Sequence, residues 1–104
     1  MSCTFFVAFE KGAEVNQDYY LTKHQPMVHG FWKDMGMKGW KVQKAVSDVS
    51  PYELIITYEW ESVESFVKMR DTVPEEQQKQ MRDDFVNFSK KEPLMWATSV
   101  VSHS

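Results

Sequence analysis

The chain has 104 residues, with 12 lysines and arginines against 15 aspartates and glutamates, and a formal net charge of -3. This length predicts one small domain over residues 1–104. The acidic charge argues against binding nucleic acid or an anionic membrane, since both need clustered positive charge. A lone cysteine, the absence of a signal-peptide pattern and the absence of an apolar run long enough to span a bilayer predict a cytoplasmic protein.

The N-terminal part predicts a strand followed by a helix. Residues 3–9 form a short apolar run rich in aromatic side chains, which is typical of a strand buried on both faces. Asn16 or Asp18 can then cap a helix. That helix is expected to end near Met35, because Gly36 follows it and Gly39 lies close behind.

Two strands are predicted next, over residues 40–47 and 52–60, with a turn between them. The second strand shows the clearest alternation between two sets of side chains. One of its faces carries the apolar side chains Tyr52, Leu54, Ile56, Tyr58 and Trp60.

The last part predicts further helix and a final strand. Ser62 can cap a short helix that ends near Asp71, and Pro74 can open another. The charged run 75–84 is most simply a solvated helix face. Residues 94–102 predict the fourth strand.

The order strand, helix, strand, strand, helix, strand predicts an α+β, ferredoxin-like βαββαβ fold, in which a four-stranded antiparallel sheet carries its helices on one face. Several positions on the other face are apolar, among them Phe6, Ala8 and Ile55. Because a monomer rarely exposes such a surface, we expect two sheets to pack face to face in a homodimer.

His24 breaks the apolar pattern of the first helix. On a helical wheel it lies at the centre of a stripe formed by Tyr20, Met27, Val28, Phe31 and Met35. A buried polar group without a partner costs on the order of 1–3 kcal/mol, so His24 either bonds a strand carbonyl or Tyr58 within the core, or faces a cavity. In a cavity, imidazole suits proton transfer near neutral pH.

Residues near His24 in the predicted fold complete a candidate site. Pro26 lacks an N–H group and should bend the helix beside the histidine. Tyr58 is the candidate second catalytic residue, because it could orient His24 or donate to an oxyanion. Helix residues Tyr20, Met27, Val28 and Phe31 and the strand tryptophans Trp40, Trp60 and Trp96 are candidates to bind a flat ring, although core filling is the alternative for each tryptophan.

Motifs for other chemistries are missing. The sequence has no glycine-rich phosphate loop, no Cys/His metal spacing and no Gly-x-Ser-x-Gly elbow. We therefore expect no metal and no cofactor.

The segment Tyr20-Leu-Thr-Lys-His24-Gln-Pro26-Met27 resembles the Tyr-x-x-x-His-x-Pro-Leu signature of the EthD family, with methionine in place of leucine at its end. The segment Asp84-Phe-Val-Asn-Phe88 is similar to a second recurring stretch of that family. The resemblance implies the dimeric α+β barrel fold and a homodimer. It also implies action on aromatic or polyketide-like compounds, since oxygenation of anthrones and decarboxylation are attributed to such domains.

The resulting functional hypothesis is a cofactor-independent enzyme that oxygenates a small hydrophobic or aromatic substrate after His24 removes a proton from it. Decarboxylation and cyclisation share that first step and remain alternatives. A dimeric accessory protein that binds its ligand without turnover is the alternative from another class. A haem-binding barrel is a third hypothesis.

Overall fold

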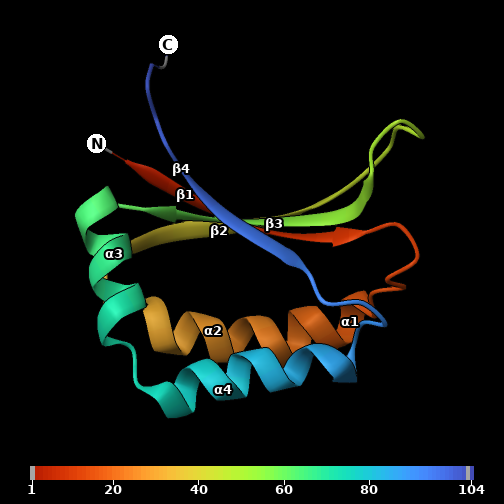
Figure 1. Ribbon diagram of the computed structural model, residues 1–104, viewed down its shortest axis with the longest axis horizontal. Coiled ribbons are helices and arrows are strands. Elements are labelled where there is room, and N and C mark those ends of the chain that lie inside the picture. The colour runs from red at the N-terminus through yellow and green to blue at the C-terminus, as the bar shows by residue number, and fades with distance from the viewer. Residues whose placement is uncertain (1, 103) are drawn as a thin grey trace.

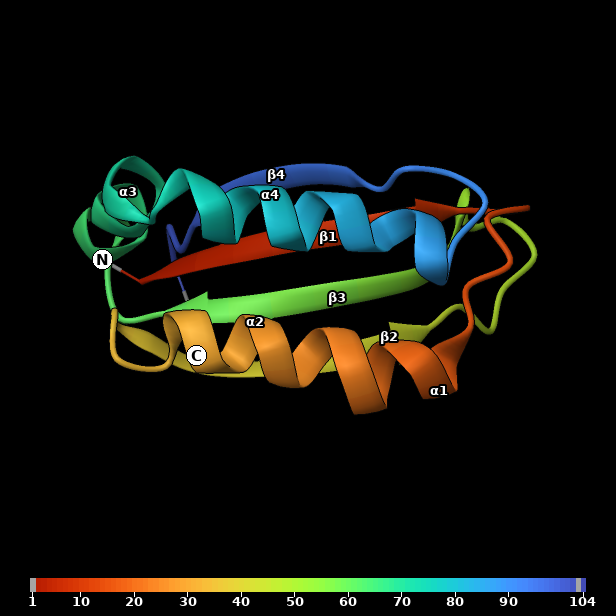
Figure 2. The same cartoon turned by 90° about the horizontal axis from the view of Figure 1, so that it is seen from below.

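The computed structural model describes residues 2–102 and 104. Its elements are, in order, β1 (Cys3–Glu10), α1 (Gln17–Tyr19), the π-helical segment η1 (Tyr20–His24), α2 (Gln25–Trp32), β2 (Met37–Lys44), β3 (Tyr52–Trp60), α3 (Val63–Thr72), α4 (Glu75–Asp83), the 3-10 turn η2 (Asp84–Asn87) and β4 (Leu94–Ser99). The strands form an antiparallel sheet in the order β2-β3-β1-β4. In Figures 1 and 2, α2 and α4 lie side by side across one face of this sheet. The predicted α+β, ferredoxin-like fold is confirmed.

The central strands β1 and β3 divide their side chains between two faces. Phe5 pairs with Tyr58 and Val7 pairs with Ile56. These side chains point toward the helices, and Val7, Ile56 and Tyr58 are buried there. Because successive side chains of a strand point to opposite sides, Phe6 and its partner Thr57 lie on the face away from the helices.

The first helix widens where Pro26 interrupts its hydrogen bonds. The N–H of Gln25 bonds the carbonyl of Tyr20, five residues back, and α2 begins directly afterwards. The expected bend is therefore a π turn, in which an extra residue is accommodated. This turn rotates the later positions, so the buried side chains recur as Tyr20, His24, Val28 and Trp32.

The other predicted boundaries differ in accuracy. The cap at Ser62 is confirmed, since its Oγ accepts a hydrogen bond from the N–H of Ser65 (3.0 Å) and the Ser65 hydroxyl oxygen accepts one from the N–H of Ser62 (3.1 Å). The second strand was expected over 40–47, whereas β2 begins at Met37. Its register with β3 shifts between Met37 and Gly39, and this irregularity keeps Gly39 inside the strand.

Gly36 alone marks the turn between α2 and β2. Its φ angle is +101°, in the left-handed region that favours glycine. A Cβ atom at this position would lie 2.8 Å from the Cβ of Ser65. The start of β2 therefore approaches α3 too closely for a larger residue.

We call the sheet surface away from the helices the outer face; it carries Phe6, Ala8, Ile55, Thr57, Leu94 and Trp96. The rings of Phe6 and Trp96 stack with centroids 5.0 Å apart. Trp96 is 37% exposed and Leu94 is 43% exposed. Tyr52 was expected on the helix side, but its ring lies 6.0 Å from that of Trp96. The register shift between Phe9 and Glu10 at the end of β1 accounts for this change of side.

Candidate functional site

A cavity of about 350 Å³ lies between the helices and the sheet. Its walls are mainly apolar and aromatic, with a few polar side chains, which is the usual character of a small-molecule site. The sheet contributes Phe5, Val7, Tyr58 and Met95, and the helical segments contribute Tyr20, His24, Val28, Trp32, Phe66, Met69, Arg70, Gln78, Met81, Arg82 and Phe85, with Val73 between α3 and α4.

His24 is buried on this wall and is held by Asp84. Its Nδ1 lies 2.9 Å from Oδ2 of Asp84, which is at the start of η2. The imidazole ring packs against the rings of Tyr20, Phe85 and Phe88, with centroids 5.4, 5.3 and 4.9 Å away. The carboxylate and the surrounding rings therefore fix the orientation of the histidine.

Asp84 is itself fixed by two further donors. Its Oδ1 accepts hydrogen bonds from the Tyr19 hydroxyl (2.7 Å) and from Nδ2 of Asn87 (2.9 Å). Burial raises the pKa of the Asp84 carboxyl, but the hydrogen bonds from Asn87, Tyr19 and His24 outweigh it and hold that pKa below its ordinary value. Asp84 is therefore ionised at neutral pH and can only accept hydrogen bonds.

The protonation of His24 follows from these contacts. Burial lowers the pKa of His24 below its ordinary value of 6.5, and the hydrogen bond and charge of Asp84 act in the opposite direction without cancelling the effect. The imidazole is therefore neutral at neutral pH. Because Asp84 can only accept, the proton lies on Nδ1, and Nε2 keeps a free lone pair. Such a nitrogen on a cavity wall can take a proton from a ligand.

Tyr20 and Tyr58 place two hydroxyl groups at the same cavity. The two hydroxyl oxygens are 2.7 Å apart, and the amide oxygen of Gln25 accepts from both, at 2.8 and 2.9 Å. Burial raises the pKa of both tyrosines, so both remain protonated at neutral pH. Both side chains can therefore supply hydrogen-bond donors but not bases.

Four of the predicted site residues come together at the cavity, namely Tyr20, His24, Val28 and Tyr58. Tyr58 does not orient His24 as expected, since its hydroxyl bonds Tyr20 and Gln25 and the partner of the histidine is Asp84.

The remaining five predicted ligand contacts do not line this cavity. The π turn rotates Met27 and Phe31 away from the buried row, where Trp32 takes their place. Trp60 is fully buried against Trp32 and Phe66 and fills the core.

The other two tryptophans lie elsewhere on the sheet. Trp96 stacks on the outer face. Trp40 is 39% exposed on β2, beside a shallow hollow shared with Lys38 and Glu59. Trp96 pairs with Phe6 on the outer face, whereas Trp40 pairs with Tyr58 on the helix side but lies on the edge strand β2, outside the cavity lining.

Sequence reasoning missed Asp84, Gln25 and Trp32. The run 75–84 was interpreted as a solvated face, and nothing local distinguishes Asp84 from Asp83. The similarity of segment 84–88 to a recurring EthD stretch was the available signal. For Trp32, spacing by fours from Tyr20 is the pattern that would have found it.

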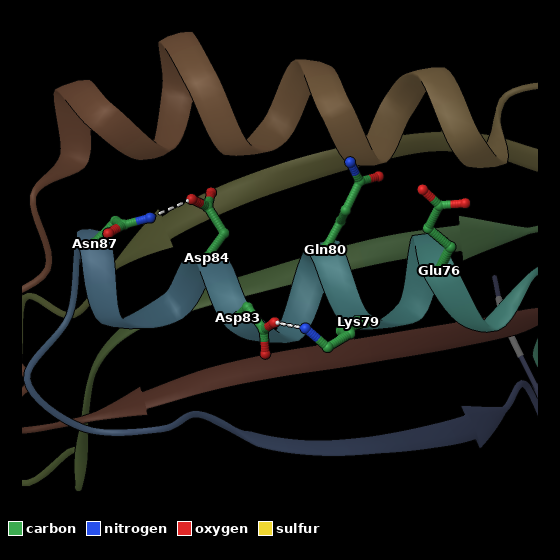
Figure 3. A pocket seen from close by; sticks show the side chains of 6 residues that line it. All are labelled: Glu76, Lys79, Gln80, Asp83, Asp84 and Asn87. Carbon is green, nitrogen blue, oxygen red and sulfur yellow. Dashed lines mark hydrogen bonds and ion pairs between the residues drawn. The ribbon is translucent and has the colours of Figure 1, made fainter.

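A second hollow, of about 420 Å³, lies on the outward side of α4. Figure 3 shows its polar lining, with Lys79 bonded to Asp83 and Asn87 bonded to Asp84. Asp84 lines this hollow and also bonds the histidine of the cavity, with one oxygen toward His24 and the other toward Asn87 and Tyr19. The second hollow has no apolar wall comparable to that of the cavity.

Among residues 2–102 and 104, no group of three or more His, Cys, Asp and Glu side chains is arranged to hold a metal ion. Within the same residues, none of the helices has the length and apolar character that a bilayer crossing requires.

Comparisons with known proteins bear on the fold. No protein-family model matches the sequence, and no curated protein matches it. Among solved structures, the chain is similar to an EthD-like protein from Ralstonia eutropha JMP134, with 19% identity over 99% of this chain and 95% of that one and a TM-score of 0.74.

Two further solved structures agree with the first. An EthD family protein from Bacillus halodurans C-125 has 18% identity over 97% of this chain and all of its own, with a TM-score of 0.71. A dimeric ferredoxin-like protein of unknown function from Jannaschia sp. CCS1 has 11% identity over 96% of this chain and all of its own, with a TM-score of 0.67. The chain therefore has the ferredoxin-like α+β fold of solved EthD-like proteins, in agreement with the resemblance of its Tyr20–Met27 segment.

Proposed function

We propose that the chain is an EthD-type enzyme that takes a flat aromatic or polyketide-like compound into the cavity and removes a proton from it with Nε2 of His24. One observation carries this proposal: a buried histidine lines the cavity, with Nδ1 bonded to an ionised carboxylate and Nε2 unpaired among the described residues. A histidine that only filled the core would gain from a second partner.

Asp84 and the two tyrosines would support different parts of a proton transfer to His24. Asp84 keeps the proton on Nδ1 and stabilises the imidazolium that forms when Nε2 takes a second one. Removing a proton from the ligand leaves negative charge on an enolate or phenolate oxygen. The hydroxyl groups of Tyr20, on the same helical segment as His24, and of Tyr58, on the sheet, would donate to such an oxygen.

The hydroxyl network beside the cavity gains a free hydrogen-bond donor if the Gln25 amide turns over. Two hydroxyl hydrogens serve three close contacts among Tyr20, Tyr58 and Gln25, while Nε2 of Gln25 is buried without a partner. If the Gln25 amide turns over, Nε2 donates to both phenolic oxygens. One hydroxyl hydrogen then becomes free for a ligand. The buried N–H of Trp32, on the same cavity, also lacks a partner.

Oxygenation is the outcome that we propose for the resulting carbanion. His24 takes one proton from an activated CH2 group. The resulting carbanion forms a C–O bond with dioxygen, whose outer oxygen then carries the negative charge. This peroxide anion takes the proton back from His24 and becomes a hydroperoxide. Loss of the remaining C–H proton together with hydroxide leaves a carbonyl group and water, so the sum is CH2 plus O2 giving C=O plus H2O. No further oxidant is needed.

We further propose that two chains pack through their outer faces. The partly exposed rings and aliphatic side chains there, including Phe6, Trp96 and Leu94, support this arrangement. The Jannaschia protein of the same fold is described as dimeric. Burying these side chains removes apolar surface from water, which is the main driving force for association.

The test uses anthrone as a probe, with an oxygen electrode and chromatography. We expect oxygen uptake in equal amount to the anthraquinone formed, with label from 18O2 in the new carbonyl group. Carbon dioxide release from an arylacetic or β-keto acid probe without oxygen uptake would replace oxygenation by decarboxylation. Saturable binding of these probes with no turnover would overturn the enzymatic proposal in favour of a binding protein.

A further inference from the structure

The exposed residues of the cavity lining mark where it opens. Arg70 on α3, Arg82 on α4 and Met95 on β4 are exposed. By contrast, residues such as Tyr20, His24 and Trp32 are buried and form the inner wall. A ligand must therefore pass between α3, α4 and β4, and its outer end remains beside the two arginines.

These two arginines are the only ones in the chain. The chain also has ten lysines, and none of them lines the cavity. Arginine presents a planar fork of N–H donors that matches the two oxygens of a carboxylate, whereas lysine offers a single point charge. Both side chains suited to bidentate recognition are thus placed at one opening.

The charge at the opening is not cancelled by the cavity itself. No aspartate or glutamate appears among the residues that line it. Arg70 has Nε 3.2 Å from Oδ1 of Asp71, but both side chains are exposed, so this pair contributes little and can be exchanged for a ligand. The Arg82 guanidinium makes no hydrogen bond or ion pair within residues 2–102 and 104.

We infer that the cavity selects aromatic ligands that carry a carboxylate, with the ring against the inner wall and the carboxylate between Arg70 and Arg82. This inference rests on the proposed function, because it names the substrate class for the same cavity. A net charge of -3 would otherwise disfavour an anionic ligand, so the two arginines provide the local attraction that entry requires. The bound carboxylate would hold the distal part of the ligand beside His24.

The experiment compares 2-naphthoate with its neutral analogue 2-naphthamide by isothermal titration calorimetry at pH 7. The proteins are the unmodified chain, Arg70→Gln, Arg82→Gln and the double variant. Lys79→Gln is the matched control, since it removes one positive charge from α4 at the other hollow. We expect the unmodified chain to bind the carboxylate about tenfold more tightly than the amide. The double variant should lose that preference and bind the amide unchanged, and Lys79→Gln should behave as the unmodified chain.

Two results would overturn the inference. Equal affinity for the two probes in the unmodified chain would show that the opening does not recognise the carboxylate. A preference that survives in the double variant would place the recognition elsewhere. In both cases binding of the amide would leave the cavity proposal standing. If neither probe binds, the proposed ligand cavity is wrong together with the inference. Binding of the amide therefore tells the two failures apart.

Discussion

The two faces of the sheet are both rich in aromatic residues, yet they differ in their polar groups. On the helix side, His24, Tyr20 and Tyr58 bring an imidazole and two hydroxyls to an apolar cavity. On the outer face, Phe6 and Trp96 stack on each other and remain partly exposed. Aromatic content alone therefore does not locate a site. What distinguishes the faces is a helix that carries hydrogen-bonding side chains over one of them.

The largest expected effect comes from placing a charge on the outer face. In a symmetric dimer, Trp96→Glu would bury two carboxylates at one interface, at a cost of several kcal/mol for each ion. We expect a dimer to become a monomer by sedimentation equilibrium while the helical content is kept. Val86→Glu, which alters a 79% exposed residue in the helical layer, is the control and should stay dimeric. A monomeric unmodified chain would refute the outer-face interface.

On the helix side, His24→Gln should lower the turnover of anthrone by about 100-fold or more, because the amide cannot accept the proton. The matched control is His29→Gln, which changes an exposed histidine of α2. It should keep full activity. Equal rates in the two variants would mean that His24 has only a structural role.

Asp84→Asn should have a smaller effect on the same reaction. The amide can still occupy the space but no longer fixes the tautomer or stabilises the imidazolium, so we expect a loss of about tenfold in kcat. The pH profile of kcat should also shift, because the negative charge beside the imidazole is gone. Asp83→Asn is the control, since its carboxylate pairs with exposed Lys79. An unchanged pH profile in Asp84→Asn would show that the Asp84 carboxylate has no part in the proton transfer.

The smallest effect concerns stability against acid. Because the pKa of His24 is lower in the folded chain than its ordinary 6.5, the unfolded chain binds this proton more readily. The free energy of unfolding should therefore fall as the pH falls below about 6.5, by about 1.4 kcal/mol for each unit between the two pKa values. Urea unfolding at pH 7.5, 6.5 and 5.5 measures this fall in the free energy of unfolding. The dependence of that free energy on pH should persist in His29→Gln and weaken in His24→Gln.

Local patterns predicted the elements that depend on neighbours in sequence. The strand over 52–60 and the cap at Ser62 are confirmed at their residues. The burial of His24 also followed from its position in the apolar stripe.

Features that join distant segments could not be derived in this way. His24 and Asp84 are 60 residues apart, and their hydrogen bond depends on how α4 and η2 pack beside α2. The wheel assumed a regular helix, so the extra residue of the π turn misplaced Met27 and Phe31. The tryptophans were assigned by residue type, whereas strand register and bulges decide which surface each ring reaches.

The wide turn before Pro26 also determines the shape of the space beside it. Side chains four apart drift around a regular helix by about 40° at each step, yet Tyr20, His24, Val28 and Trp32 all reach the same cavity. Twelve residues of helix span roughly 18 Å. The cavity, of about 350 Å³, is thus lined along this length by one row of four side chains. We therefore expect the aromatic ligand of the proposed function to lie along this row of side chains.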